Sequence, residues 1–213
     1  MLGIEGGISI LGTSGSVEPM SEQALIDTVE LALRQAAALD TGCRGEKRLI
    51  LTPGSYGEKY LHAVGLDALG VPVVKCSNFI GEALDAAAVQ GFSEVLLVGH
   101  VGKLVKLAGG VMNTHSAQAD CRAELFTAHA ALCGADRTLC RALMEAVTAD
   151  ACLKLLAEAG LRETVLKSLL TAIQTHLDRR AAGRMKVGAA MFSNEYGGLG
   201  ETDEAGRMRK EWA

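Results

Sequence analysis

The chain has 213 residues, of which 49% are hydrophobic, and a formal net charge of −4 without long runs of one sign. This hydrophobic content supports a sizeable core and argues against intrinsic disorder. The acidic balance argues against nucleic-acid binding through a basic surface, and aromatic residues at 4% remove the stacking platforms of single-strand binders. We find no secretory signal and no apolar run of membrane-spanning length, so we expect a cytoplasmic protein that does not bind membranes.

Short apolar runs that end in glycine-rich or polar turns alternate with helical patterns. The predicted strands are 8–11, 48–51, 71–75, 94–99 and 186–192. The predicted helices are 21–39, 58–69, 79–90, a short one after Gly102, 117–132, 137–147, 150–159 and 163–182. Strands that alternate with helices indicate a mainly parallel sheet with helices on both faces. The predicted fold class is therefore α/β, with a three-layer Rossmann-like domain, a mainly parallel sheet of about five strands, and a helical insertion before the last strand.

The predicted domain covers residues 1–200, with the helical insertion at about 117–183. Residues 201–213 are rich in charge, and we expect them to form a loosely held C-terminal tail. No internal repeat is evident beyond the alternation of strands and helices.

The stretch 94–115 combines a predicted buried strand, a glycine turn with a polar side chain, and a short helix. Its apolar run suits a strand that is buried on both faces. The run ends at Gly99, and His100 follows in a turn that Gly102 closes before a short helix. In open α/β sheets such a turn lies at the carboxyl end of the strand, where ligands bind.

Polar side chains follow each of the predicted strands, so parallel strands would bring them to one rim. Hydroxyls, amides, imidazoles and amines dominate there, which suits a ligand rich in acceptors, such as a polycarboxylate or a nucleoside. The candidate residues are Thr13, Ser14, Ser77, Asn78, His100, Lys103, Lys106 and His115.

Each candidate also has a plain structural interpretation. The turn that contains Thr13 and Ser14 is neither a GxGxxG fingerprint nor a P-loop. Ser77 or Asn78 would make an ordinary helix N-cap. The two lysines, one turn apart, would also suit a solvated helix face, and His115 would suit a polar cap.

The sequence offers no metal site and no disulfide framework. Its six cysteines form no CxxC pair, and most stand in alanine-rich helical sequence. We interpret them as reduced, small apolar residues. No metal-ligand spacing and no Ser-His-Asp order stands out.

Several stretches together resemble one known family. They are GIEGGISILGT (3–13), VEPMS (17–21), LTPG (51–54), SNFIGEAL (77–84), VGHVGKLVKL (98–107) and MNTHS (112–116). In this order they resemble CbiD, the family of cobalt-precorrin-5B carbon-1 methyltransferases of anaerobic cobalamin biosynthesis. The resemblance covers almost the whole chain.

The resemblance implies transfer of a methyl group from S-adenosylmethionine to carbon 1 of a cobalt-containing, multi-carboxylate macrocycle. His100 would be the polar group nearest the chemistry. Lys103, Lys106 and His115 would contact the substrate. The donor would be bound by Thr13, Ser14, Ser77 and Asn78.

Family members begin with a further domain, whereas here Met1-Leu2 leads straight into GIEGG. We therefore expect the C-terminal domain alone, with an uncovered apolar face through which it associates, as in a homo-oligomer. The alternative is a non-catalytic domain that clamps the macrocycle or mediates association. A nicotinamide-dependent enzyme is disfavoured because the GxGxxG fingerprint is missing.

Overall fold

The computed structural model describes residues 21–39 and 46–212. In this part of the chain five strands form one sheet in the order β2-β1-β3-β4-β5. They are β1 (Arg48–Thr52), β2 (Val73–Lys75), β3 (Glu94–His100), β4 (Lys186–Ser193) and β5 (Gly197–Glu201). The first four are parallel, and β5 runs antiparallel to β4. The predicted α/β class with a mainly parallel sheet is confirmed.

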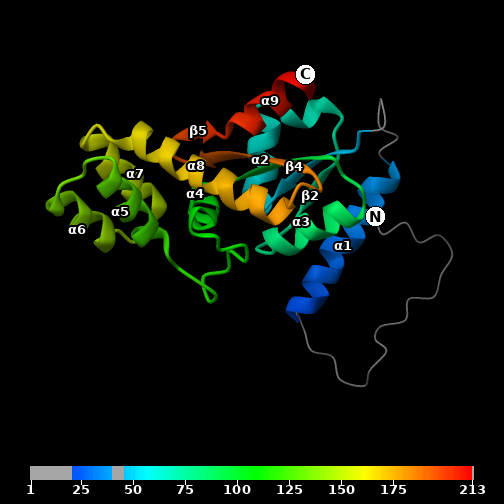
Figure 1. Cartoon of the computed structure of the whole chain (residues 1–213), viewed down its shortest axis with the longest axis horizontal. Coiled ribbons are helices and arrows are strands. Elements are labelled where there is room, and N and C mark those ends of the chain that lie inside the picture. The colour runs from blue at the N-terminus through cyan, green and yellow to red at the C-terminus, as the bar shows by residue number, and fades with distance from the viewer. Residues whose placement is uncertain (1–20, 40–45, 213) are drawn as a thin grey trace.

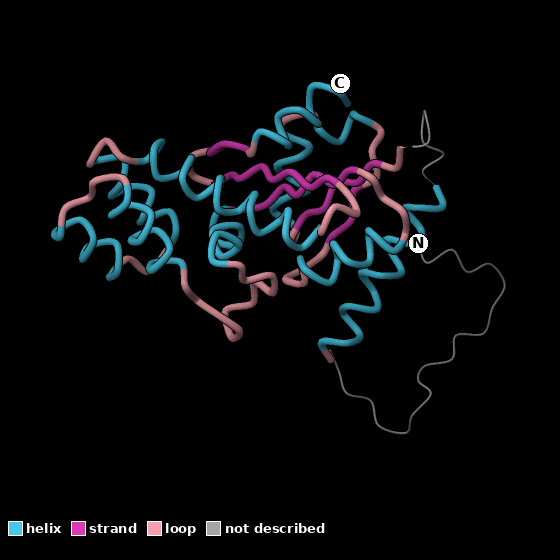
Figure 2. Tube along the Cα trace, in the orientation of Figure 1, coloured by secondary structure: helices cyan, strands magenta, loops and turns pink. Residues whose placement is uncertain are grey.

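Helices cover both faces of the sheet (Figure 1). They are α1 (Glu22–Leu39), α2 (Ser55–Ala63), α3 (Ile80–Val89), α4 (Val101–Leu104), α5 (Arg122–Leu132), α6 (Arg137–Glu145), α7 (Ala149–Glu158), α8 (Arg162–Ala181) and α9 (Asp203–Trp212), with short 3-10 helices η2 (Leu66–Leu69) and η3 (Val105–Gly109). One face carries α1, α3 and α8, and the other carries α2 and α9. The helices α5, α6 and α7 extend beyond one end of the sheet (Figures 1 and 2). No helix in residues 21–39 or 46–212 is long and apolar enough to span a membrane.

The central strand β3 divides the hydrophobic core in two. Val95 and Leu97 belong to the cluster beneath α3 and α8, and Leu96 and Val98 belong to the cluster beneath α2 and α9. All four side chains are fully buried. The unbroken apolar run predicted this burial, because alternate side chains point to opposite faces of a strand.

The fifth described strand differs from the prediction. The strand expected at 8–11 lies outside the described residues. The glycine-rich segment after Ser193, for which the sequence predicted no strand, pairs with β4 as β5, with an irregularity in register at Met191/Phe192. Glycine disfavours strands by propensity, but pairing with β4 outweighs that preference at the edge of the sheet.

The prediction of a loosely held tail is wrong. Ala205, Met208 and Trp212 of α9 are buried against the sheet. Their spacing of three and four residues places them on one helical face. The surrounding charged residues hid this short apolar stripe in the sequence.

Two predicted helices have different boundaries. The helix expected at 58–69 is divided into α2 and η2, because Gly65 has a φ of 71°, in the left-handed region. The helix expected to begin at residue 117 begins at Arg122. The preceding residues form a loop around a buried lysine, described below.

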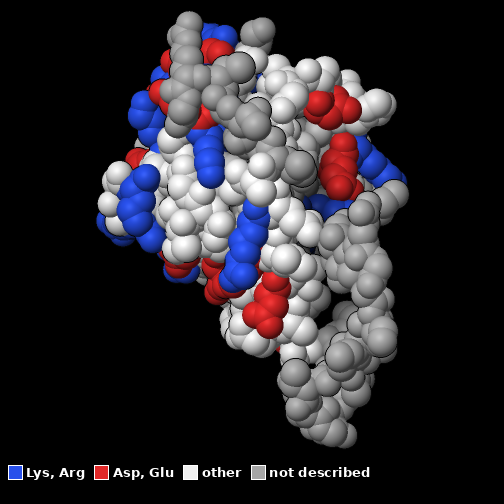
Figure 3. Space-filling model, turned by 90° about the vertical axis from the view of Figure 1, so that its right-hand side faces the viewer, with Lys and Arg blue, Asp and Glu red and all other residues white. Residues whose placement is uncertain are grey.

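Charges of both signs are mixed on the side of the molecule that lies at the right in Figure 1. Figure 3 shows that Lys and Arg alternate there with Asp and Glu over a largely uncharged surface. The described cysteines are free, and two of them, Cys76 and Cys152, are buried.

A buried carboxylate ties α9 to the start of β3. Glu94 is only 5% exposed. Its carboxylate accepts hydrogen bonds from Nη2 of Arg207 at 2.6 Å and from Nε1 of Trp212 at 2.8 Å. Arg48 adds an ion pair at 3.4 Å. Burial acts to raise the pKa of Glu94, but the hydrogen bonds from Arg207 and Trp212 and the nearby charges outweigh it and hold the pKa below its ordinary value.

We predict that Glu94→Gln lowers the free energy of unfolding by about 2 kcal/mol at neutral pH, because it removes a buried, partnered charge. Since the folded-state pKa is depressed, this contribution is present above the ordinary carboxyl pKa and is lost as the pH falls through the folded value. Urea unfolding at pH 7 and below about pH 4 measures both effects.

The control for this experiment is Glu158→Gln on the exposed end of α7. A Glu94→Gln variant as stable as this control at neutral pH would contradict the prediction.

Candidate functional site

The loops that follow β1, β2, β3 and β4 meet at one edge of the sheet, which we call the carboxyl edge (residues 53–57, 76–79, 100–103 and 193–196). The backbone N–H of Cys76 donates to the carbonyl of Thr52 at 3.0 Å, which joins the ends of β1 and β2. His100 at the end of β3 lies opposite Phe192 of β4. Parallel pairing therefore places polar residues from four separate segments side by side.

His100 is the last residue of β3 and the N-cap of α4. Its Nδ1 accepts a hydrogen bond from the N–H of Gly102 at 3.1 Å. Because that partner is a donor, the neutral ring carries its proton on Nε2. The ring packs edge-on against Phe192, with centroids 5.6 Å apart, and lies 6.3 Å from the ring of Tyr56. Burial lowers the pKa of His100, which favours the neutral ring.

Lys103 connects the loops after β1, β2 and β3. Its Nζ donates to the carbonyl of Ser77 at 3.5 Å. The same Nζ lies beside Gly54 in the loop after β1: a methyl group in place of the glycine hydrogen would be 3.6 Å from it. Gly54 has a φ of 95°. Burial lowers the pKa of Lys103. An ammonium in this position lacks part of its hydration and gains from an anionic ligand.

Ser77 and Asn78 are not helix caps. The N-cap of α3 is Phe79, which makes no side-chain capping bond. Ser77 has a φ of 53°, which is unusual for a residue with a side chain. Its hydroxyl and the side-chain NH₂ of Asn78 make no hydrogen bond within the described residues. Both groups are therefore available to a ligand.

The loop after η3 returns to the end of β2. The N–H and the hydroxyl of Thr114 donate to the backbone and side-chain oxygens of Asn78 at 2.9 and 3.3 Å, and Phe79 forms a bridge with Asn113. His115 is exposed on this loop, and its Nδ1 accepts from the N–H of Ala117 at 3.1 Å. No contact within the described residues joins His115 to His100.

Lys106, which the sequence predicts to contact the substrate, is bonded to the backbone of the loop that follows η3. It is 3% exposed. Its Nζ donates to the carbonyls of Thr114 at 3.1 Å and Ala119 at 2.8 Å, and Asp120 lies 3.9 Å away. The loop that wraps this ammonium is the reason that α5 begins later than the helical pattern indicated.

Sequence reasoning missed one carboxylate at the carboxyl edge. Asp150, in the first turn of α7, accepts a hydrogen bond from the hydroxyl of Ser193 at 2.6 Å. The same hydroxyl oxygen accepts from the N–H groups of Glu195 and Tyr196 at 3.0 and 3.2 Å. Asp150 acts to raise the pKa of His100, against the larger effect of burial. In the sequence Asp150 looked like an ordinary residue of a helix first turn, and no local signal linked it to β4.

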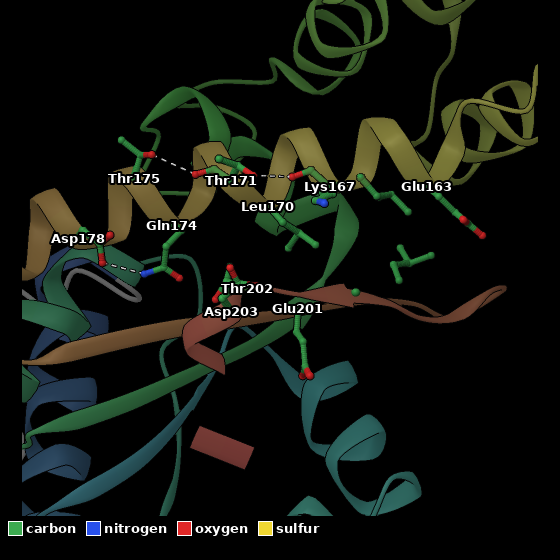
Figure 4. Close-up of a pocket in the computed structure, with 13 residues that line it drawn as sticks. Glu163, Lys167, Leu170, Thr171, Gln174, Thr175, Asp178, Glu201, Thr202 and Asp203 are labelled. Carbon is green, nitrogen blue, oxygen red and sulfur yellow. Dashed lines mark hydrogen bonds between the residues drawn. The ribbon is translucent and has the colours of Figure 1, made fainter. Parts of the chain in front are cut away.

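A hollow between α8 and β5 lies away from these residues (Figure 4). Its volume is about 490 Å³, and its charged lining residues are Glu163, Lys167, Asp178, Glu201 and Asp203. None of the predicted site residues lines it. Thr13 and Ser14 lie outside the described residues.

A mainly parallel sheet with polar loops gathered at its carboxyl edge defines an α/β protein of the class whose members bind ligands at the strand ends. Residues 113–203 match the family described as "CbiD, C-terminal domain". The sequence of these residues is similar to that domain, and the resemblance noted in the sequence is confirmed. No solved structure gives a significant match.

Curated relatives carry the name "Cobalt-precorrin-5B C(1)-methyltransferase". The protein of Ruminiclostridium cellulolyticum is 45% identical over 194 residues, which are 91% of this chain and 49% of the relative. The protein of Alkaliphilus metalliredigens is 39% identical over 213 residues, which cover 97% of this chain and 53% of the relative. The protein of Methanocaldococcus jannaschii is 38% identical over 182 residues, which cover 85% of this chain and 49% of the relative. The chain spans about half the length of the curated relatives it matches.

We predict that Asp150→Asn lowers the pKa of His100 further, because the variant keeps an oxygen for Ser193 but loses the negative charge. The pH dependence of the imidazole NMR signal, assigned with His100→Gln, measures this shift. Asp27→Asn on α1 is the control. An unchanged or raised pKa in Asp150→Asn would show that the carboxylate does not act on the ring.

We also predict that Lys106→Met destabilises the fold by about 1–3 kcal/mol, because two loop carbonyls lose their buried donor. Lys154→Met, at an exposed position of α7, is the matched control. If urea unfolding gives the two variants the same stability, Lys106 has no structural role.

Proposed function

We propose that this chain carries the substrate- and donor-binding site of a cobalt-precorrin-5B carbon-1 methyltransferase, at the carboxyl edge of its sheet. The observation that carries the proposal is that Lys103 contacts Ser77 from the neighbouring loop, while His100 begins the same short helix. The names of the relatives supply the reaction. The domain boundary expected at residue 200 moves to include α9, which packs on the sheet. The cytoplasmic location expected from the sequence belongs to the same proposal.

The residues of the carboxyl edge suit S-adenosylmethionine as the methyl donor. The hydroxyl of Ser77 and the NH₂ of Asn78 have no other partner in the described part and would bond the oxygen and nitrogen acceptors of a nucleoside. Thr13 and Ser14 stay in the proposal as further donor contacts. When bound, S-adenosylmethionine supplies an electrophilic methyl group on a cationic sulfur.

Methyl transfer requires alignment of donor and acceptor more than acid–base chemistry. In this proposal Lys103 holds a substrate carboxylate by a charge-assisted hydrogen bond. His100, neutral and fixed through Nδ1, donates its Nε2–H to an acceptor on the macrocycle and so orients the carbon that is methylated. His115 contacts a peripheral carboxylate from its exposed loop, and Lys106 is no longer assigned a substrate contact.

The distribution of charge favours the carboxyl edge over the hollow between α8 and β5 as the place for this substrate. The hollow between α8 and β5 is lined by four carboxylates and one lysine. A macrocycle with several carboxylates is repelled there, whereas Lys103 at the carboxyl edge has no carboxylate within ion-pair distance among the described residues.

A second candidate function is a clamp that binds the macrocycle without catalysing the transfer. The observation in its favour is that the chain covers only 49% of the R. cellulolyticum relative. In that case the reacting methyl group is held by the part of the relatives that the match does not cover.

Calorimetric titration of the chain with S-adenosylhomocysteine, and separately with a cobalt corrinoid that bears free carboxylates, tests the proposal. We predict that both bind and that Lys103→Met weakens corrinoid binding about tenfold or more, because one charge-assisted bond is lost. Lys154→Met is the control. Corrinoid binding without donor binding favours the clamp, and binding of neither ligand overturns the proposal.

A further inference from the structure

The cations at the carboxyl edge fall into two groups. Lys106 and Arg122 share the carboxylate of Asp120, at 3.9 and 2.7 Å. Lys103 and Arg162 have no carboxylate within ion-pair distance in the described part of the chain. A cation that is held in place but lacks a counter-charge is poised to bind an anion from outside.

Arg162 is held against an aromatic ring. Its guanidinium carbon lies 5.6 Å from the ring centroid of Tyr196, within the range of a cation–π contact. Tyr196 belongs to the turn that follows β4, and its N–H donates to the hydroxyl of Ser193, which also binds Asp150. The contact therefore attaches the guanidinium to the same edge of the sheet as His100 and Lys103.

The stability of α8 does not account for this arginine. Arg162 is the first residue of α8, a helix of 20 residues. A cation at that end meets the positive end of the helix dipole, which is unfavourable. The ring of Tyr196 offsets part of this cost and restricts the side chain, while the planar fork of N–H donors keeps its capacity for a carboxylate.

We propose that Arg162, oriented by Tyr196, is a second carboxylate-binding residue of the substrate site. It holds one acidic side chain of the macrocycle beside β4, while Lys103 holds another between the loops that follow β2 and β3. This inference rests on the proposed function and names the part of the substrate that is recognised. Two anchored carboxylates fix the orientation of a large ring, which a single contact leaves free to rotate.

The test compares two cobalt corrinoids that differ only in whether their acidic side chains are free or amidated. We expect Arg162→Gln to weaken binding of the free acid by about tenfold or more and to leave the amidated compound nearly unchanged. Arg162→Lys, which keeps the charge but loses the fork, falls between wild type and Arg162→Gln. Tyr196→Leu weakens binding of the free acid while retaining the arginine.

Arg137→Gln is the matched control, because Arg137 is exposed and also stands at the first residue of its helix, α6. Circular dichroism verifies that each variant is folded. Equal affinity of wild type and Arg162→Gln for the free-acid corrinoid overturns the inference and leaves the proposed function standing.

If the chain binds no corrinoid, the proposed function fails and a second measurement decides the inference. Citrate is titrated into the chain while the Nε–H NMR signal of Arg162 is followed. A saturable shift that is absent in Tyr196→Leu supports an oriented carboxylate site. A signal that does not move overturns it.

Discussion

The parallel pairing of β3 with a strand on each side is the constraint on which the rest of the molecule depends. Because β1 and β4 both run alongside it in the same direction, the connections from β1 to β3 and from β3 to β4 must cross a face of the sheet. The crossing helices bury β3 from above and below. The same arrangement forces the loops after four strands to one edge, so the chemistry of that edge is assembled from segments far apart in the sequence.

The two ends of β3 use charge in opposite ways. At its start Glu94 is buried and fully partnered, and it joins three segments of the chain. Just beyond its end Lys103 is partly buried, and among the described residues its ammonium makes one long hydrogen bond, 3.5 Å, to a backbone carbonyl. The bonds of Glu94 stabilise the fold, whereas the ammonium of Lys103 can still donate hydrogen bonds to a ligand.

Patterns with a strong period predicted most of the fold. The apolar run of β3 defines that strand, and the buried stripe Val165, Leu169, Ile173 and Leu177 defines α8. Both patterns are visible in the sequence, because they follow from side-chain burial alone. The segments at β5 and α9 were misjudged because glycine content and charge density report local preference, whereas pairing with β4 and burial of Trp212 come from distant residues. Within the site, His100 stood out between two glycines. The different fates of Lys103 and Lys106 depend on a loop whose path no local pattern specifies, and Asp150 reaches β4 only through the tertiary fold.

The hydrogen bond between Gly102 and Nδ1 of His100 has a consequence for acid–base chemistry at this position. A ring that already accepts at Nδ1 can take up a proton only by giving up that bond, and with it the cap of α4. Protonation of His100 at Nδ1 therefore costs the hydrogen bond that orders the first turn of α4. A reaction that withdrew a proton through this imidazole would loosen the helix that carries Lys103 in every cycle.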